Sequence, residues 1–356
     1  MNRMMNGEGA PSFQAAPFPQ GIIYQSMYQP DPAYPFLHDT ALGIWQGRII
    51  CAWYNCTQGE IRGDTIIRGR WSADGGKTWT DQEIIAASPD PGVHYVPVSF
   101  TDDGKDFYAF VTRMCGHDQP TGYEIFRYTG SGWESVALRA DRMLINTPAY
   151  RMDDGHYLIA GRVCFPGYPH PEIPNVAVSE TSDVLSNYRM IEFDGPWQQE
   201  SFTLRYPETA VIIDGKDITA FVRGEGFTRQ PQERPYRFTS DDYGRTWSQG
   251  ELMDLPCIGS KLFGGTLSNG LSYLVFSAEN DRGNNRSLLA LAVSKRGEDR
   301  ISRRYRLLDG PHNATGLTPE WSYPCSMEYD GRLYIACTSH KSGAILMTVP
   351  ISALES

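Results

Sequence analysis

Short apolar runs alternate with turns along most of this chain. A glycine preceded by aspartate or asparagine marks the turn at five of six places, and glutamine precedes it at the sixth: Gln46-Gly47, Asp103-Gly104, Asp154-Gly155, Asp214-Gly215, Asn269-Gly270 and Asp330-Gly331. The six glycines are 57, 51, 60, 55 and 61 residues apart. Because Asp-Gly or Asn-Gly between apolar runs is the strongest short signal for a β-hairpin, the pattern predicts six hairpins at a nearly regular interval.

A third apolar run follows each predicted hairpin, at residues 65–70, 123–128, 175–178, 236–239, 288–293 and 344–350. Six units of about 50 to 60 residues match the blades of a six-bladed β-propeller, each blade being a four-stranded antiparallel sheet. The last unit lacks room for a fourth strand, and residues 21–26 form a spare strand ahead of the first unit. We therefore expect an all-β fold in one domain over residues 21–356, closed by the N-terminal strand, after an N-terminal extension over residues 1–20.

Two octapeptides fit the pattern S-x-D-x-G-x-T-W, namely SADGGKTW at residues 72–79 and SDDYGRTW at residues 240–247. A serine hydroxyl and an aspartate carboxylate in this spacing can accept hydrogen bonds from nearby backbone N–H groups, and the glycine supplies a positive φ. The tryptophan can pack against the neighbouring strand. Each octapeptide is thus a self-contained turn, and its recurrence indicates a repeated β unit.

Composition narrows the classes of partner. The chain has 35 glycines and 24 prolines in 356 residues, which suits many short strands and tight turns. Its 32 basic and 42 acidic residues give a net charge of −10, so we expect no nucleic-acid partner. No apolar stretch reaches the roughly 18 to 20 residues that span a bilayer. Residues 1–19 lack the apolar segment of a secretory signal, which predicts a cytoplasmic location for the chain as given.

Cysteine and histidine spacing gives no sign of a metal or cofactor. The seven cysteines are an odd number and none is spaced as a metal ligand pair, so we expect reduced, mostly buried thiols. The seven histidines form no close pair suited to zinc, and no phosphate-binding loop or nucleophile elbow is present. The sequence therefore predicts no cofactor and no metal.

Polar residues concentrate at one face of the predicted propeller. In an antiparallel blade the first strand begins on the face where the second strand ends. The residues that this rule brings to one face are His38, Asp39, Tyr95, Asn146, Tyr206, Glu208, Lys261, Trp321 and Tyr323 at strand starts, Asn55, Arg113, Arg162, Arg223, Glu279 and His340 at strand ends, and Glu60, Asp64, Asp281 and Arg286 in the following loops. Arginines, carboxylates and tyrosines together predict a polar site on this face.

The chain resembles the sialidase superfamily from about residue 21 to its end. The octapeptides are similar to the Asp boxes of that superfamily, which lie away from the active site. The segment Tyr206-Pro207-Glu208-Thr209, followed by Arg223 at a strand end, is similar to the family's paired glutamate and arginine. Arg286 resembles a second arginine that binds the substrate carboxylate, and Tyr323 resembles the family's nucleophile.

This resemblance implies a glycoside hydrolase, exo-acting on an acidic terminal sugar of a glycan such as sialic acid. Tyr323 is then the nucleophile and Glu208 its base, because a neutral phenol, unlike a carboxylate, is not repelled by an acid group beside the anomeric carbon. Arg223 and Arg286 bind the acid group, and the general acid is Glu60 or Asp64. Further candidates for substrate binding are Arg162, Arg113, His38, Asp39, Tyr95 and Glu279.

One departure from the family pattern keeps other functions open. The family's first carboxylate-binding arginine lies at the head of blade one, where this chain has Phe36-Leu37-His38-Asp39-Thr40 and no arginine. Arg113 or Arg162 from a neighbouring blade is a candidate replacement. The first alternative is another exo-glycosidase, or a lyase acting on uronate-containing glycans, on the same fold. The second is a propeller that binds carbohydrate without turning it over.

Overall fold

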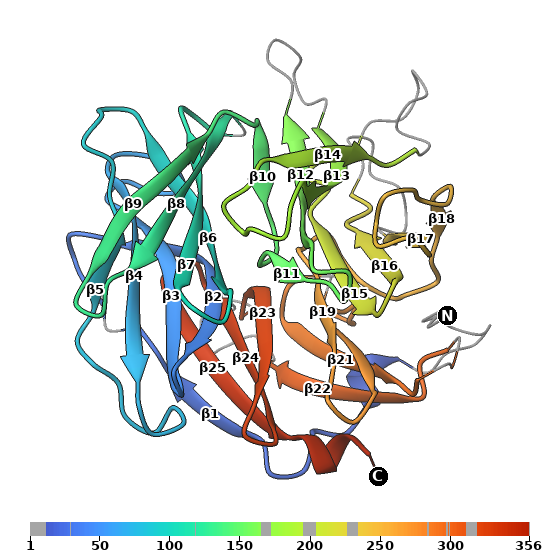
Figure 1. Ribbon diagram of the computed structural model, residues 1–356. Coiled ribbons are helices and arrows are strands. Elements are labelled where there is room, and N and C mark those ends of the chain that lie inside the picture. Colours follow the sequence, from blue (N-terminus) through green and yellow to red (C-terminus); the bar gives the residue numbers. More distant parts are fainter. Residues whose placement is uncertain are drawn as a thin grey trace.

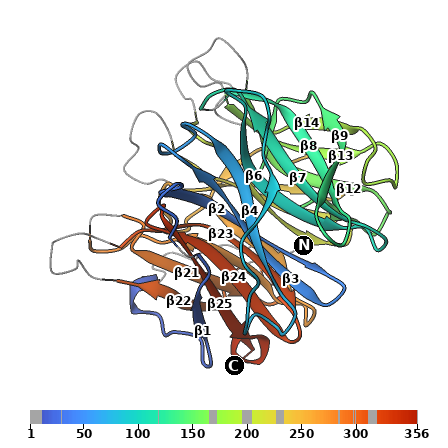
Figure 2. The same cartoon turned by 90° about the vertical axis from the view of Figure 1, so that its left-hand side faces the viewer.

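The computed structural model describes residues 12–28, 30–117, 119–164, 172–194, 204–225, 234–282, 285–296, 298, 300–310 and 319–355. Over these residues the chain is a six-bladed β-propeller of antiparallel sheets, and the predicted fold is confirmed. Figure 1 shows the six sheets in a ring, and Figure 2 shows the ring turned by 90°.

Each blade runs outward from an inner strand at the axis, and the blades follow one another in chain order. Blade one consists of β2 (Phe36–Trp45), β3 (Arg48–Cys56), β4 (Thr65–Ser72) and β5 (Glu83–Ala86). Blade two consists of β6 (His94–Asp102), β7 (Phe107–Met114), β8 (Pro120–Tyr128) and β9 (Trp133–Arg139). Blade three consists of β10 (Met143–Ile145), β11 (Tyr150–Arg151), β12 (Tyr157–Cys164), β13 (Glu172–Ser179) and β14 (Tyr188–Glu192).

The second half of the ring repeats this arrangement. Blade four consists of β15 (Thr209–Asp214), β16 (Asp217–Val222), β17 (Tyr236–Ser240) and β18 (Glu251–Leu252). Blade five consists of β19 (Phe263–Thr266), β20 (Ser272–Ser277), β21 (Leu288–Ser294) and β22 (Arg303–Asp309). Blade six consists of β23 (Trp321–Tyr329), β24 (Arg332–Ser339), β25 (Gly343–Pro350) and β1 (Ile23–Ser26), followed by the short helix η3 (Ile351–Leu354).

The N-terminal strand closes the ring, as the sequence predicts. Strand β1 pairs antiparallel with β25, with Ile23 opposite Thr348 and Ser26 opposite Ile345. In Figure 2 the dark blue β1 lies alongside the red β25. The chain thus supplies the fourth strand of blade six from its other end, and the outer edge of β25 is paired instead of left open.

The inner strand of blade three is interrupted, which the sequence pattern did not predict. Strands β10 and β11 both pair with β12, and residues 146–149 separate them. Pro148 lies in this break and has no N–H to donate to a ladder. The side chain of Thr147 fills part of the gap, since its Oγ1 accepts a hydrogen bond from the N–H of Ala160 at 2.9 Å.

The hydrophobic core lies between neighbouring blades. One cluster joins Ile50 and Trp71 of blade one to Phe100 and Phe107 of blade two, and the other clusters join the next pairs of blades in the same way. Burying such side chains stabilises the fold by about 1.5–3 kcal/mol each. Short helix η1 (Phe13–Ala15) adds to this core, because Phe13 contacts Phe276 of blade five with ring centroids 5.0 Å apart.

Residues 12–20 of the predicted N-terminal extension lie against blade five: the N–H of Arg306 donates to the carbonyl of Pro17 at 2.9 Å. Residues 1–11 of the extension lie outside the described residues, so the boundary at residue 20 stays a prediction.

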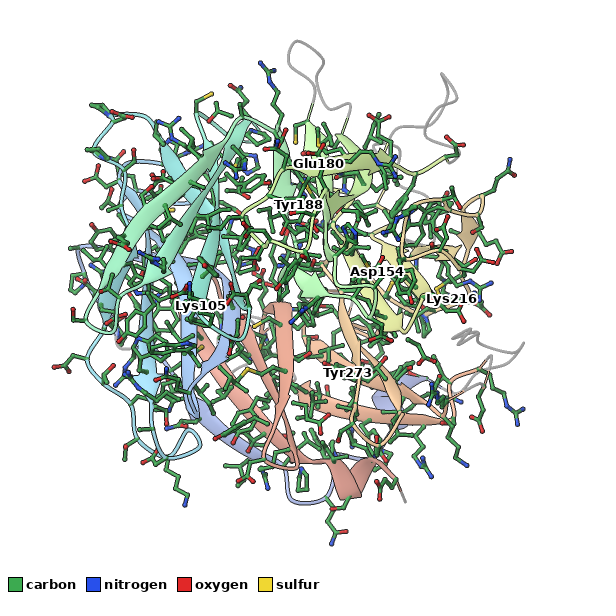
Figure 3. All side chains as sticks on the ribbon, in the orientation of Figure 1. Lys105, Asp154, Glu180, Tyr188, Lys216 and Tyr273 are labelled. Carbon is green, nitrogen blue, oxygen red and sulfur yellow. The ribbon has the colours of Figure 1, made fainter. Side chains whose placement is uncertain are left out.

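The predicted hairpin turns and Asp boxes occur as expected. All six turn glycines have φ between 62° and 90°, the left-handed region that glycine enters at little cost. Lys105, Asp154 and Lys216, which lie in the turns of blades two, three and four, are labelled in Figure 3. In the first Asp box, Asp74 Oδ1 accepts from the N–H groups of Lys77 and Thr78 at 3.0 and 2.9 Å, and Asp242 makes the same two contacts in the second.

Candidate functional site

A polar pocket of about 250 Å³ opens where the inner strands begin. Its described lining residues are Asp39, Tyr54, Glu60, Ile61, Val96, Pro97, Met114, His117, Leu144, Asn146, Arg162, Arg205, Tyr206, Glu208, Arg223, Arg286, Tyr323 and Lys341. Farther along the same strands a second cavity of about 540 Å³ is lined by Phe100, Phe107, Phe263 and other largely apolar residues. The second cavity has one arginine among its lining residues, whereas the first has four, and two of its carboxylates, Asp39 and Glu208, are buried. We therefore take the first cavity as the candidate active site.

Local backbone strain directs three side chains into this pocket. Asp39, Tyr206 and Tyr323 have φ values of 49°, 52° and 55°, in the left-handed region that residues other than glycine rarely adopt. Bulges at two of these places, Asp39 and Tyr323, shift the ladder register between His38 and Ala41 and between Ser322 and Cys325. Strained residues that face one pocket are typical of functional sites, where the surrounding structure offsets the cost of the conformation.

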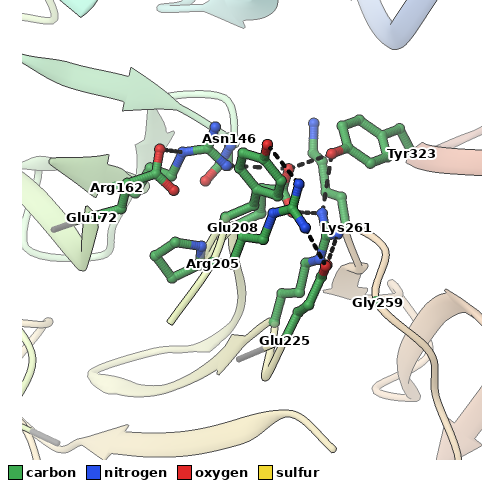
Figure 4. Close-up of polar contacts among 12 residues, drawn as sticks. Asn146, Arg162, Glu172, Arg205, Glu208, Glu225, Gly259, Lys261 and Tyr323 are labelled. Atoms are coloured by element: carbon green, nitrogen blue, oxygen red, sulfur yellow. Dashed lines mark hydrogen bonds and ion pairs between the residues drawn. The ribbon is translucent and has the colours of Figure 1, made fainter. Parts of the chain in front are cut away.

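Tyr323, Glu208 and Arg223 form one hydrogen-bonded group in the pocket. Figure 4 labels Tyr323 and Glu208 together with the charged side chains around them. The Tyr323 hydroxyl donates to Glu208 Oε1 at 2.5 Å. Arg223 Nη1 donates to Glu208 Oε2 at 2.7 Å and to the Tyr323 oxygen at 3.1 Å. Tyr323 begins blade six while the other two residues belong to blade four, so the fold joins chain segments about a hundred residues apart.

Further ion pairs surround this group. Arg162 Nη1 lies 3.3 Å from Glu208 Oε1, and Arg162 Nε lies 3.1 Å from Glu172 Oε1. Arg223 Nη2 pairs with Glu225 on the other side. The side chains of Arg162, Arg223 and Glu208 are each at most 5% exposed, so both arginines are buried with carboxylate partners.

These charges fix the protonation states of the central pair. Burial alone would raise the pKa of Glu208, but Arg223, Arg162 and the Tyr323 hydrogen bond lower it to about 2. The pKa of Tyr323 is raised, chiefly by burial and by the negative charge of Glu208, although Arg223 and Arg286 act in the opposite direction. In the resting site the proton therefore resides on the phenol oxygen, and Glu208 is a carboxylate ready to accept it.

His38 and Asp39 occupy the head of blade one, where the resemblance led us to expect an arginine. Asp39 Oδ1 accepts a hydrogen bond from Lys261 Nζ at 2.7 Å, and the two side chains are 7% and 5% exposed. Burial raises the pKa of Asp39, partly offset by the Lys261 charge. His38 is buried behind Asp39, and its Nδ1 lies 3.1 Å from Thr338 Oγ1.

Three further cations of the lining, Arg286, Lys341 and Arg205, each lie near a carboxylate. Arg286 Nη1 lies 3.3 Å from Glu320 Oε1, and its Nη2 donates to the carbonyl of Gly259 at 2.9 Å. Lys341 Nζ donates to Glu60 Oε2 at 2.7 Å, which ties blade six to the loop after β3. Arg205 is 45% exposed and lies 3.8 Å from Glu225.

Seven of the twelve predicted site residues line the pocket: Tyr323, Glu208, Glu60, Arg223, Arg286, Arg162 and Asp39. The other five do not. His38 lies behind the lining, and Asp64 is exposed at the end of its loop. Arg113 pairs with Asp90 at 2.9 Å, Tyr95 donates to Glu124 at 2.5 Å, and Glu279 pairs with Arg234 at 3.4 Å. Those partners lie outside the pocket lining, and substrate-binding roles for Arg113, Tyr95 and Glu279 stay predictions that their placement does not support.

The sequence-based prediction of the site missed several residues. Arg205, Tyr54 and Lys341 line the pocket, and Glu172, Glu225 and Glu320 neutralise its arginines. A usable signal existed for two of them, since Glu225 follows Arg223 by two residues and Lys341 follows the strand end at Ser339. Glu172 lies at the start of β13 and Glu320 directly precedes β23. No hairpin signal in the sequence marks either position.

Among the residues with described positions, no group of three or more histidine, cysteine, aspartate or glutamate side chains is arranged to hold a metal ion. Within the same residues, no helix has the length and apolar character needed to cross a bilayer. All seven cysteines are free and six are buried, so the predicted burial of most thiols is confirmed.

Comparison with solved structures places the fold among sialidase-like propellers. The NanB sialidase of Streptococcus pneumoniae superposes with a TM-score of 0.70 at 12% identity, covering 93% of this chain and 71% of that chain. A mutant Trypanosoma rangeli sialidase displaying trans-sialidase activity gives 0.66 at 11% identity, covering 96% and 60%. A Dyadobacter fermentans protein of unknown function gives 0.65 at 14% identity, covering 93% and 100%. The chain thus spans about three fifths of the length of the trypanosomal enzyme.

Comparison with curated proteins finds no match to the sequence. The family model for a BNR repeat-like domain matches residues 47–335, which is most of the propeller. The protein therefore belongs to the family with a BNR repeat-like domain.

Proposed function

We propose that this protein is a sialidase-like glycoside hydrolase that removes an acidic terminal sugar from a glycan, with Tyr323 as the nucleophile. The observation that carries the proposal is the 2.5 Å hydrogen bond from the Tyr323 hydroxyl to Glu208, with Arg223 3.1 Å from the same hydroxyl oxygen. A nucleophile held by a base, with the base oriented by a third group, is the arrangement expected for covalent catalysis.

The first half of the reaction forms a glycosyl-enzyme. Glu208 accepts the phenolic proton as the Tyr323 oxygen bonds to the anomeric carbon, and the bond to the leaving-group oxygen breaks. The low pKa of Glu208 opposes complete transfer before attack, so proton transfer and bond formation are concerted. Arg223 and Arg162 remain beside the pair and stabilise the negative charge wherever it resides.

Glu60 is the better placed of the two predicted general acids. It lines the pocket, whereas Asp64 does not. In this scheme Glu60 donates a proton to the departing glycosidic oxygen and then takes one from the water that attacks the glycosyl-tyrosine. Glu208 returns its proton to Tyr323 when that bond breaks, so the enzyme is regenerated and the product retains its anomeric configuration.

The size and charge of the pocket support an exo-acting enzyme on an acidic sugar. A volume of about 250 Å³ is below the ~300–1,000 Å³ of sites for larger ligands, which favours a single ring over an internal stretch of chain. Five lining side chains are cationic and three are anionic: Arg162, Arg205, Arg223, Arg286 and Lys341 against Asp39, Glu60 and Glu208. Glu172, Glu225 and Glu320 outside the lining balance this excess. The attraction for an anionic ligand therefore comes from cations that remain exposed, such as Arg205.

The test is turnover of aryl glycosides of acidic sugars by the Tyr323→Phe variant. We expect turnover to fall at least a thousandfold, while Tyr188→Phe, which removes a buried phenol that donates to the carbonyl of Val184, keeps full activity. A fluorinated glycosyl fluoride should label Tyr323 in the wild type, as detected by peptide mass. Full activity of Tyr323→Phe would refute the role, and binding of acidic glycans without turnover of any of them would favour the binding-only propeller.

A further inference from the structure

The pocket has an inner layer around Tyr323, where buried charged side chains pair with one another, and an outer layer, where cations are open to solvent. We propose that the acidic sugar is a uronic acid, whose carboxylate lies away from the anomeric carbon, and not an ulosonic acid, whose carboxylate is bonded to the anomeric carbon. This inference rests on the proposed function, because it assumes that Tyr323 attacks the anomeric carbon.

The innermost layer is unfavourable for another carboxylate. A group bonded to the carbon that Tyr323 attacks lies next to the tyrosine oxygen, and that oxygen is already 2.5 Å from Glu208 Oε1. Asp39 contributes a second buried carboxylate to this region, since its partner Lys261 has its Nζ 5.9 Å from the Tyr323 ring centroid. An anomeric carboxylate would therefore meet two anions in a region of low dielectric.

The buried arginines of this layer are already occupied by the protein's own carboxylates. Both terminal nitrogens of Arg223 are engaged, one by Glu208 and the other by Glu225. Arg162 lies between Glu172 and Glu208. A substrate carboxylate that bound here bidentately would have to displace an internal partner and leave that partner buried and unpaired.

The outer layer offers cations that remain open to solvent. Arg205 is 45% exposed, and the 3.8 Å to its nearest carboxylate, Glu225, is too long for a hydrogen bond. Its guanidinium lies over the Tyr206 ring, 4.8 Å from the centroid, which holds it at the pocket mouth. Lys341 is 29% exposed and pairs with Glu60. Arg286 belongs to the inner layer, since its guanidinium lies 5.5 Å from the Tyr323 ring centroid, and Glu320 and the carbonyl of Gly259 already engage it. The carboxylate of a uronic acid projects from the carbon beyond the ring oxygen, and from there it can reach this layer.

Asp39 also fits a uronic acid in a second respect. A uronic acid carries a hydroxyl on the carbon next to the anomeric carbon, and that hydroxyl can donate a hydrogen bond to a carboxylate. A 3-deoxy ulosonic acid such as sialic acid has a methylene group there and offers no donor. Hydrogen bonds to this hydroxyl strengthen as positive charge develops at the anomeric carbon, so Asp39 would act as a specificity-determining residue.

The experiment compares kcat/KM of the wild-type protein on three sets of aryl glycosides, in both anomeric forms. The sets are uronides, the matching neutral hexosides, and ketosides of N-acetylneuraminic acid and of its deaminated analogue. We expect uronides to be turned over at least tenfold better than either other set. Faster turnover of the ketosides overturns the inference and leaves the proposed function standing. Turnover of neutral hexosides alone, or of nothing, overturns both.

Two variants test the layers separately. Arg205→Gln should raise KM for uronides at least fivefold and leave neutral hexosides unaffected, while Lys105→Met, in an exposed turn away from the pocket, changes neither. Asp39→Asn should lower uronide kcat/KM at least tenfold and tighten the binding of the free ulosonic acids in calorimetry. The double variant Asp39→Asn, Lys261→Met removes both charges, so it reports on Asp39 if the single variant fails to fold. Unchanged substrate preference in Arg205→Gln and in the folded Asp39 variants would overturn the assignment.

Discussion

The imidazole ring of His38 lies against the phenol ring of Tyr323, with the two ring centroids 4.1 Å apart. Burial lowers the pKa of His38 well below its usual value, and the charges of Lys341, Arg286, Lys261 and Arg223 lower it further. The histidine is therefore neutral and supports the nucleophile from behind. An arginine at this position would place a buried charge among those same cations, which gives a physical reason for its absence.

His38→Ala should weaken both stability and catalysis. Removing the ring leaves a cavity behind Tyr323, which we expect to cost about 2–4 kcal/mol, as for other large buried side chains. Since the tyrosine then loses its support, kcat should fall more than KM rises. Urea unfolding and steady-state kinetics measure the two effects. His38→Phe keeps an aromatic ring and should retain most of the activity; equal loss in both variants would show that the imidazole acts chemically.

Glu208→Gln should be inactive and less stable. The amide cannot accept the Tyr323 proton, so we expect turnover to fall at least a thousandfold. Arg223 and Arg162 would lose the charge they share, and breaking a buried ion pair from one side costs about 3–5 kcal/mol. Denaturant unfolding at pH 7 measures this loss. A glutamine variant as stable as the wild type would mean that Glu172 and Glu225 alone neutralise the two arginines.

The same carboxylate should make stability depend on pH in the acid range. Its pKa is about 2 in the folded protein and 4.5 in the reference state, so Glu208 stabilises the fold above pH 4.5 and loses this contribution as the pH falls toward 2. The difference corresponds to about 3 kcal/mol. Other lowered carboxylates, such as Asp242, titrate in the same range. The test is therefore the difference between wild type and Glu208→Gln, which should shrink between pH 5 and pH 3 and would stay constant if Glu208 were not linked to folding.

Gly224→Ala should disturb the arginine beside it. A Cβ atom at residue 224 would lie 1.6 Å from the backbone carbonyl oxygen of Arg234, so the backbone must move. Arg223 immediately precedes this glycine, and a shift there alters its contacts with Glu208 and Tyr323. We expect more than about 1 kcal/mol of destabilisation together with a reduced kcat. Gly132→Ala is the matched control, because a Cβ there meets nothing within 4 Å, and equal behaviour of the two variants would contradict the argument.

The hairpin signals were sufficient to predict the propeller, and the strand-end rule was sufficient to predict the face of the site. Neither could show which side chains at that face point toward the axis. Tyr95 and Arg113 lie opposite each other in the ladder, as the rule requires, yet Tyr95 turns outward to Glu124 on β8 and Arg113 pairs with Asp90 in a loop. The direction of such a side chain depends on its partner, and the partner lies on a chain segment that comes close only when the chain has folded into the ring. The strand-end rule brought Glu208 and Tyr323 to this face, and the resemblance suggested their roles. The neutralisation of the buried arginines by Glu172 and Glu225 is visible only in three dimensions.

The choice between Glu60 and Asp64 as general acid can be decided by leaving-group dependence. Glu60 lines the pocket and contacts Lys341 at 2.7 Å, whereas Asp64 is exposed outside the lining. Glu60→Gln should lower kcat/KM at least a hundredfold on substrates with sugar leaving groups, which need a proton. On aryl glycosides with acidic phenols the loss should be much smaller, because these leave unassisted. Asp64→Asn, an equivalent charge removal four residues away, should behave as wild type on both sets. The reverse pattern would make Asp64 the acid and require the loop after β3 to fold inward during catalysis.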